Sequence, residues 1–299
     1  MAPYEVRVMR RSYFWQLVVL TGLTVVGQPT VWGYQKADRP AKTSIDFQLY
    51  RNYLIVVQGS AGSLKGLHFL LDTGSSPTIL DSQLARRLHL DFTPVAVAVV
   101  RGNVKGGIAI APSLELGPVR KDNVRVVIED LSYVQNAFPI RINGIVGLDV
   151  LGQSTFVIDY SSREIRFGPA PSMPNSIQLQ VEDGLAFVDA EFNNARVRLL
   201  VDTGAYSLVV FKELPDLTPG EEGDVAQLLP KRIGDFNRKR ARQVSLRLGE
   251  VEFGHGSAFV VANHRDAGHD FDGLMSPVAL GITKISFDLR KKTLAFVRE

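Results

Sequence analysis

The chain has 299 residues, of which 45% are hydrophobic and 22% are charged, and its formal net charge is +3. This is the composition of an ordinary globular protein that can bury a sizeable core in each of two halves. The sequence has no cysteine, which excludes a disulfide framework, a thiol nucleophile and a cysteine-ligated metal.

The N-terminal segment has the pattern of an export signal. Three arginines, Arg7, Arg10 and Arg11, precede an apolar stretch of about fifteen residues at 13–27. This stretch is short for a membrane span, which needs about twenty residues. We therefore predict that residues 1–33 are a signal peptide or an N-terminal anchor and that the protein is periplasmic or secreted. An anchor that is not cleaved would be its only contact with a membrane.

The rest of the chain is typical of a β protein. Short runs rich in Val, Ile, Leu and Phe, such as "NYLIVVQG" and "NVRVVIED", are separated by Gly, Pro, Asn and Asp. The clearest helical period lies at 81–90, where Asp81 or Ser82 can cap the first turn. The sequence predicts a mostly β fold with one or two short helices in each half.

An internal repeat organises this β region. The tripeptide Asp-Thr-Gly occurs at 72–74 and again at 202–204, each time after an apolar run. Three further blocks recur in the same order at offsets of 129 to 132 residues. The paired blocks are 113–128 with 245–261, 143–152 with 272–281, and 156–168 with 285–297. The chain therefore contains two copies of a unit of roughly 125 residues.

The repeat sets the predicted domains. They are an N-terminal lobe at 34–168, a linker rich in Pro and Gly at 169–176, and a C-terminal lobe at 177–299. The sequence leaves open whether residues at about 34–46 form a pro-segment that must be removed.

The two repeated turns suggest a pair of carboxylates. If Asp72 and Asp202 meet across a lobe interface, they cannot both ionise, and they share one proton at intermediate pH. One carboxylate can then act as a base towards a water, while the other donates a proton to a carbonyl under attack. Gly74 and Gly204 allow tight turns, and the preceding strands hold each turn on a rigid sheet.

On these motifs the chain resembles the pepsin and retroviral aspartic proteases, most closely the bacterial single-chain, two-lobed, retropepsin-like type. The resemblance covers about residues 45–299 and implies two β-barrel lobes with a cleft between them. It implies that Asp72 and Asp202 are the catalytic pair and that Thr73 and Thr203 grip each other across the interface. It also implies that Ile145–Gly147 packs beneath the first turn. The supporting residues are Thr73, Gly74, Ser75, Thr203 and Gly204.

The resemblance also implies a flap over the cleft. The segment "VVRGNVKGGIAI" at 99–110 has the glycines of such a hairpin tip, and the residues expected there are Gly102, Asn103, Gly106 and Gly107. In the second lobe, the segment 231–240 is either a second flap or an inert loop. The second lobe also departs from the first at Ser276, which aligns with Gly147.

Other polar groups are interpreted more simply. His255, His264 and His269 lack a helical i, i+4 pairing and are taken as surface residues, so no metal or other cofactor is expected. The basic run at 238–242 has no interleaved aromatic residues and is taken as a solvated loop, so no nucleic-acid partner is expected. Asp159 and Asp288 are interpreted as turn residues.

The predicted function is that of a two-lobed, monomeric aspartic endopeptidase whose substrate is a polypeptide. The alternative is a non-catalytic peptide-binding protein that keeps the fold. A further alternative is a structural duplication whose Asp-Thr-Gly segments are only turns.

The residue that follows the glycine differs between the two turns: it is Ser75 in the first turn and Ala205 in the second. A hydrogen bond from the Ser75 hydroxyl would leave the charge more often on Asp72 and the proton on Asp202.

Overall fold

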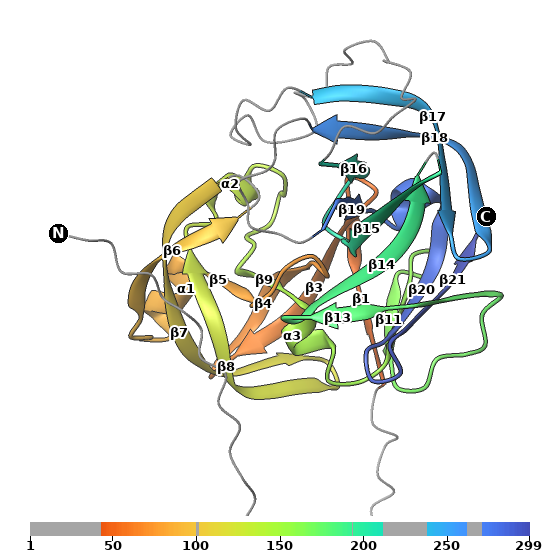
Figure 1. Cartoon of the computed structure of the whole chain (residues 1–299). Coiled ribbons are helices and arrows are strands. Elements are labelled where there is room, and N and C mark those ends of the chain that lie inside the picture. Colours follow the sequence, from red (N-terminus) through yellow and green to blue (C-terminus); the bar gives the residue numbers. More distant parts are fainter. Residues whose placement is uncertain (1–42, 100–101, 193, 212–237, 262–270) are drawn as a thin grey trace, which may run out of the picture. The chain divides into compact units, whose positions relative to one another are not determined.

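A computed structural model of the chain describes residues 43–99, 102–192, 194–211, 238–261 and 271–299 (Figure 1). Residues 41–299 form one compact unit. The predicted signal peptide or anchor therefore lies outside the described residues. Within the described part, no helix is long and apolar enough to cross a membrane.

The fold is mostly β, as the sequence predicts, and the strands of the described residues form three sheets (Figure 1). We call the part of the chain that forms the eight-stranded sheet the first lobe. In spatial order its strands are β2 (Gln48–Tyr50), β3 (Leu54–Ala61), β4 (Leu64–Leu71), β9 (Gly144–Val146), β5 (Ile79–Asp81), β8 (Val119–Glu129), β7 (Gly102–Leu116) and β6 (Thr93–Val99).

The seven-stranded sheet defines the second lobe. Its strands, in spatial order, are β13 (Gln180–Glu182), β14 (Leu185–Phe192), β15 (Ala195–Val201), β19 (Gly273–Met275), β16 (Leu208–Val210), β18 (Val251–Val261) and β17 (Arg238–Leu248).

The third sheet joins the two halves of the chain. Its six strands, again in spatial order, are β1 (Ser44–Asp46), β11 (Glu164–Phe167), β10 (Phe156–Asp159), β20 (Ile282–Asp288), β21 (Thr293–Arg298) and β12 (Asn175–Gln178). The halves meet where β10 and β20 pair antiparallel, with Phe156 opposite Phe287. Strand β12 begins within the last two residues of the segment predicted as a linker.

The two lobes repeat one connection pattern. In the first lobe β4 runs parallel to β9, which pairs antiparallel with β5, and β5 runs parallel to β8. In the second lobe β15 and β19, β19 and β16, and β16 and β18 are related in the same way. The sequence repeat therefore corresponds to a structural repeat, and the ends of β4 and β15 are equivalent places in the two lobes.

The helices are short. In the part of the chain that the structure describes, they are α1 (Ser82–Arg87), α2 (Ser132–Gln135), α3 (Leu148–Leu151) and the 3-10 helix η2 (Val278–Leu280). The helix predicted at 81–90 is confirmed as α1, and the carboxylate of Asp81 caps it by accepting the Gln83 N–H at 3.2 Å. Leu84 on its inner face is buried.

The interpretation of the basic run at 238–242 as a loop is wrong. These residues begin β17, which pairs antiparallel with β18 from Arg238 opposite Val261 onwards (Figure 1). A run of charges indicates exposure to solvent, but one face of a strand can satisfy that requirement as well as a loop. The interpretation of Asp159 and Asp288 is confirmed, since both carboxylates accept backbone N–H groups of the turns that follow them.

Candidate active site

Each Asp-Thr-Gly turn begins where a central strand of its lobe ends. Asp72 follows β4 and Asp202 follows β15. The backbone N–H of Asp72 donates to the Val146 carbonyl, and that of Asp202 donates to the Met275 carbonyl, each at 3.0 Å. Strands β9 and β19 therefore hold the two aspartates in the same way, and the rigid sheets fix where each carboxylate starts.

The threonines of the two turns bind each other's lobe. The Thr73 hydroxyl donates to the Val201 carbonyl at 2.7 Å and accepts the Thr203 N–H at 3.1 Å. The Thr203 hydroxyl donates to the Leu71 carbonyl at 3.3 Å and accepts the Thr73 N–H at 3.0 Å. Both threonines are buried. These four reciprocal hydrogen bonds join the turns across the lobe interface, as the resemblance implies.

The glycines bring each turn against the opposite carboxyl group. A methyl group placed on Gly74 would lie 2.7 Å from Cγ of Asp202, and one placed on Gly204 would lie 2.9 Å from Cγ of Asp72. Carbon atoms do not approach so closely without displacing one another. Only glycine fits at either position, and the requirement follows from the approach of the two lobes.

The carboxyl groups of Asp72 and Asp202 are hydrogen-bonded to each other. Asp72 also accepts the Gly74 N–H at 2.8 Å, and Asp202 accepts the Gly204 N–H at 2.7 Å. Burial raises the pKa of Asp72 above its usual range. Burial and the adjacent charge of Asp72 raise the pKa of Asp202 well above its usual range. The pair therefore retains a proton at pH values where isolated aspartates have lost theirs.

The expected hydrogen bond from the Ser75 hydroxyl to Asp72 does not occur in the described part of the chain. The backbone N–H of Ser75 instead donates to the Asp72 carbonyl at 3.2 Å. Backbone N–H groups of the glycines, and of Ala205 in the second turn, bind the carboxyl groups. The asymmetry between the two aspartates therefore does not arise from a serine hydroxyl.

The loop beneath each turn differs between the lobes. A methyl group on Gly147 would overlap with the carbonyl oxygen of Ser75, so the loop after β9 packs directly on the first turn. At the equivalent place Ser276 is fully buried, and its hydroxyl accepts the Ala279 N–H at 3.3 Å. The substitution leaves the second turn equally well held, because the hydrogen bonds from Asp72 and Asp202 to these loops have the same length.

The predicted flap lies on an antiparallel hairpin. Strand β6 pairs with β7 from Thr93 opposite Ile108 to Val99 opposite Gly102, so Gly102, Asn103, Gly106 and Gly107 are all part of the ladder. The ring of Phe92 lies where a side chain at Gly107 would be. Residues 231–237 of the possible second flap are outside the described residues, while 238–240 belong to β17.

Two residues beside the turns were not singled out from the sequence. Tyr206, four residues after Asp202, contacts Tyr53 of the first lobe, with ring centroids 5.3 Å apart. Ser76, four residues after Asp72, donates its hydroxyl to the Asp183 carbonyl of the second lobe at 2.8 Å. The sequence does show that Ser76 and Tyr206 have the same spacing from their aspartates. It does not show what they contact, because their partners are distant in sequence.

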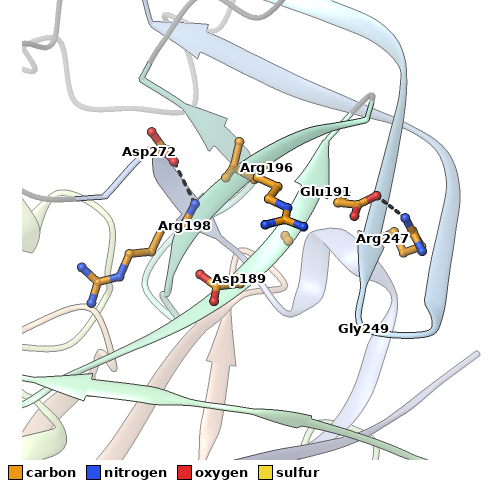
Figure 2. A pocket seen from close by; sticks show the side chains of 9 residues that line it. Asp189, Glu191, Arg196, Arg198, Arg247, Gly249 and Asp272 are labelled. Carbon is orange, nitrogen blue, oxygen red and sulfur yellow. Dashed lines mark hydrogen bonds and ion pairs between the residues drawn. The ribbon is translucent and has the colours of Figure 1, made fainter.

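A pocket of about 520 Å³ lies away from the aspartates, on the second lobe (Figure 2). Its acids already have partners: Glu191 pairs with Arg247, Asp189 accepts from Gln180 at 2.7 Å, and Asp272 accepts the Arg198 backbone N–H at 2.9 Å. Nothing in it resembles a reacting centre. Among the described residues, no group of three or more His, Asp or Glu side chains could hold a metal ion; His264 and His269 lie outside these residues.

Comparison with known proteins agrees with this geometry. Residues 57–150 match a family model described as aspartyl protease, and this range covers the first Asp-Thr-Gly turn, the β6–β7 hairpin predicted to be a flap and the loop beneath the turn. A search of curated proteins finds no match. The second lobe lies outside the matched range, but it repeats the strand connections of the first lobe and the reciprocal threonine contacts. Residues 57–150 are thus similar to the aspartyl protease family, and the described chain has the mostly β, two-lobed fold expected of its retropepsin-like type.

Proposed function

We propose that the protein is an aspartic endopeptidase that hydrolyses peptide bonds with a water activated by Asp72 and Asp202. The observation that carries this proposal is the hydrogen-bonded carboxyl pair at the meeting point of two equivalent turns. Both aspartates are half-buried, so the pair is reachable from solvent.

The chemistry follows from the shared proton. The ionised carboxylate takes a proton from the water as its oxygen attacks the peptide carbonyl, and the protonated carboxyl donates its proton to the carbonyl oxygen. When the tetrahedral intermediate collapses, the carbon–nitrogen bond breaks and a proton passes to the departing amine. Burial raises the pKa of both carboxyl groups, so the pair still holds one proton at the start of the cycle and can donate it to the carbonyl oxygen.

The test is digestion of an unbiased peptide library by the full chain, with Asp72→Asn and Asp202→Asn as variants. Each substitution should abolish turnover, and the double variant should be little worse than either single one, because residues that act as one unit are not additive. The matched control is Asp189→Asn, an exposed aspartate of the second lobe, which should leave turnover unchanged.

The same experiment separates the proposal from its main alternative. A wild-type protein that binds peptides but cleaves none would be a peptide-binding protein with the protease fold. Substantial cleavage by either single Asp→Asn variant would exclude the shared-proton mechanism.

Export is part of this proposal and is supported by the basic and apolar N-terminus. The expected site of action is the periplasm or the exterior, with a polypeptide as substrate and a monomer as the active form. Fractionation of cells that express the full chain, followed by N-terminal sequencing, tests both export and cleavage of residues 1–33. Full-length protein in the cytoplasm would contradict it.

A further inference from the structure

The two lobes contact each other symmetrically beside the aspartates, but with different side chains. The equivalent residues Ser76 and Tyr206 each lie four positions after a catalytic-pair aspartate and reach a hairpin turn of the opposite lobe. The strands that follow these hairpin turns occupy equivalent places in the two lobes. In the first lobe Val56 pairs with Leu70, which lies two residues before Asp72. In the second lobe Phe187 pairs with Leu200, which lies two residues before Asp202. By this register Tyr53 is equivalent to Gly184, three residues earlier in each case.

The Asp72 side of the site is therefore made of small groups. The Ser76 hydroxyl bonds the Asp183 carbonyl, and a methyl group on Gly184 would lie 2.5 Å from the Ser76 Oγ. Gly184 has a φ of +78°, which favours glycine and keeps a side chain out of this position. Among the described residues, this contact between Ser76 and the turn at 183–184 includes no aromatic ring.

The Asp202 side instead carries an aromatic pair. Tyr53 is 7% exposed and packs in a cluster with Leu54, Leu131 and Ile145, while Tyr206 is 43% exposed. Their rings meet edge to face at 64°. Such contacts between aromatic rings favour a defined ring position. Tyr206 thus rests on a fixed base in the first lobe while much of its surface remains open to solvent.

Both neighbours of the Tyr206 ring, its chain neighbour Ala205 and its ring partner Tyr53, interact with Asp202. The preceding residue, Ala205, donates its backbone N–H to Asp202. The position of Tyr53 agrees, because burial and the charge of Asp202 both raise the pKa of its phenol. A peptide held at the carboxyl pair would therefore present one of its nearby side chains to Tyr206.

We propose, building on the proposed function, that Tyr206 braced by Tyr53 is a specificity-determining residue that receives a bulky apolar side chain of the substrate. The preference applies to one position on one side of the scissile bond, and aromatic or branched aliphatic residues fit it best. The equivalent position beside Ser76 has no such preference. Because a site with two equivalent turns could hold a peptide in either direction, this one-sided contact also selects the direction of binding.

The first experiment compares cleavage profiles of a peptide library for the full-length wild type, Tyr206→Ser, Tyr206→Phe and Ser76→Ala. Wild type should show enrichment of Phe, Tyr, Leu or Ile at one position. Tyr206→Ser places in the second turn the residue that the first turn has, and it should reduce the kcat/KM ratio of Phe over Ala at that position by about 2- to 12-fold. Tyr206→Phe keeps the ring and should keep the preference, and Ser76→Ala should leave the profile unchanged. An identical profile for wild type and Tyr206→Ser would overturn the proposal.

The second experiment does not depend on turnover. Peptide mimics with a hydroxyl-bearing, uncleavable centre carry either Phe or Ala on each side of that centre, and their binding to wild type and Tyr206→Ser is measured by calorimetry. Tighter binding of one Phe mimic by wild type, lost in Tyr206→Ser, supports the role of Tyr206 even if the protein cleaves nothing and the proposed function fails. Equal Phe-to-Ala ratios in both proteins, or no binding of any mimic by wild type, overturn it.

Discussion

Asp72 and Asp202 place two acids where the ionisation of both is unfavourable. Burial raises the pKa of each, and the charge of Asp72 further raises that of Asp202. In the unfolded chain an aspartate has a pKa of about 3.9. The folded protein therefore binds the shared proton more tightly than the unfolded chain does. The resulting stability is fully present below the unfolded pKa and is lost as pH rises through the raised folded pKa.

Asp202→Asn should consequently make the protein more stable at neutral pH. Asparagine has nearly the same shape but cannot ionise, so the cost of two neighbouring buried charges disappears. The difference in Tm between variant and wild type should be small near pH 3 and should grow as pH rises. Thermal unfolding measured between pH 3 and 8 checks this, with the exposed Asp189→Asn as the matched control. Wild-type and Asp202→Asn curves that stay parallel across this range would contradict the raised pKa.

At the scale of elements, the loop after β9 and the loop after β19 are equivalent in the two lobes, but they are packed differently. Gly147 leaves room for the carbonyl of Ser75, whereas Ser276 uses its side chain to bind the Ala279 N–H. A backbone carbonyl cannot rotate away as a flexible side chain can. The first loop is therefore less tolerant of an added side chain than the second loop.

Gly147→Ala should destabilise the protein by about 1–3 kcal/mol, because the added methyl group forces the first turn and the loop apart. If the proposed function is correct, the displaced turn should also lower turnover. Ser276→Ala is the matched variant in the second lobe, and it should cost about 0.5–1.5 kcal/mol through the loss of one hydrogen bond. Denaturant unfolding measures both. A Gly147→Ala protein with wild-type stability would show that the loop is not packed on the turn.

The sequence predicted those elements whose signal is local. The end of each apolar run marks Asp72 and Asp202, and the capped helix at 81–90 is visible from spacing alone. It did not predict that the repeated blocks 156–168 and 285–297 pair with each other, because the partner of a strand is chosen by the tertiary fold. For the same reason the contact of Tyr206 with Tyr53 was missed, since those residues lie in different lobes.

At the scale of the whole molecule, the described lobes are held together at two levels. The threonine contacts join the turns, and the six-stranded sheet takes three strands from each half of the chain. Within that sheet Phe156 stacks on Phe287 with ring centroids 4.9 Å apart and 10° between planes, and both rings are fully buried. Neither half can complete this sheet by itself. The arrangement favours unfolding of both lobes in one transition.

Phe156→Ala tests this cooperativity. Removing a buried phenylalanine costs about 3–5 kcal/mol, and its position between the halves means that both lobes should lose stability together. Hydrogen exchange should show β3 of the first lobe and β14 of the second lobe losing protection by similar amounts, and calorimetry should show one transition at a lower Tm. Phe92→Ala, which removes an exposed ring, is the control and should change neither. Loss of protection in β3 alone, with β14 unchanged, would mean that the lobes unfold independently and that the shared sheet does not couple them.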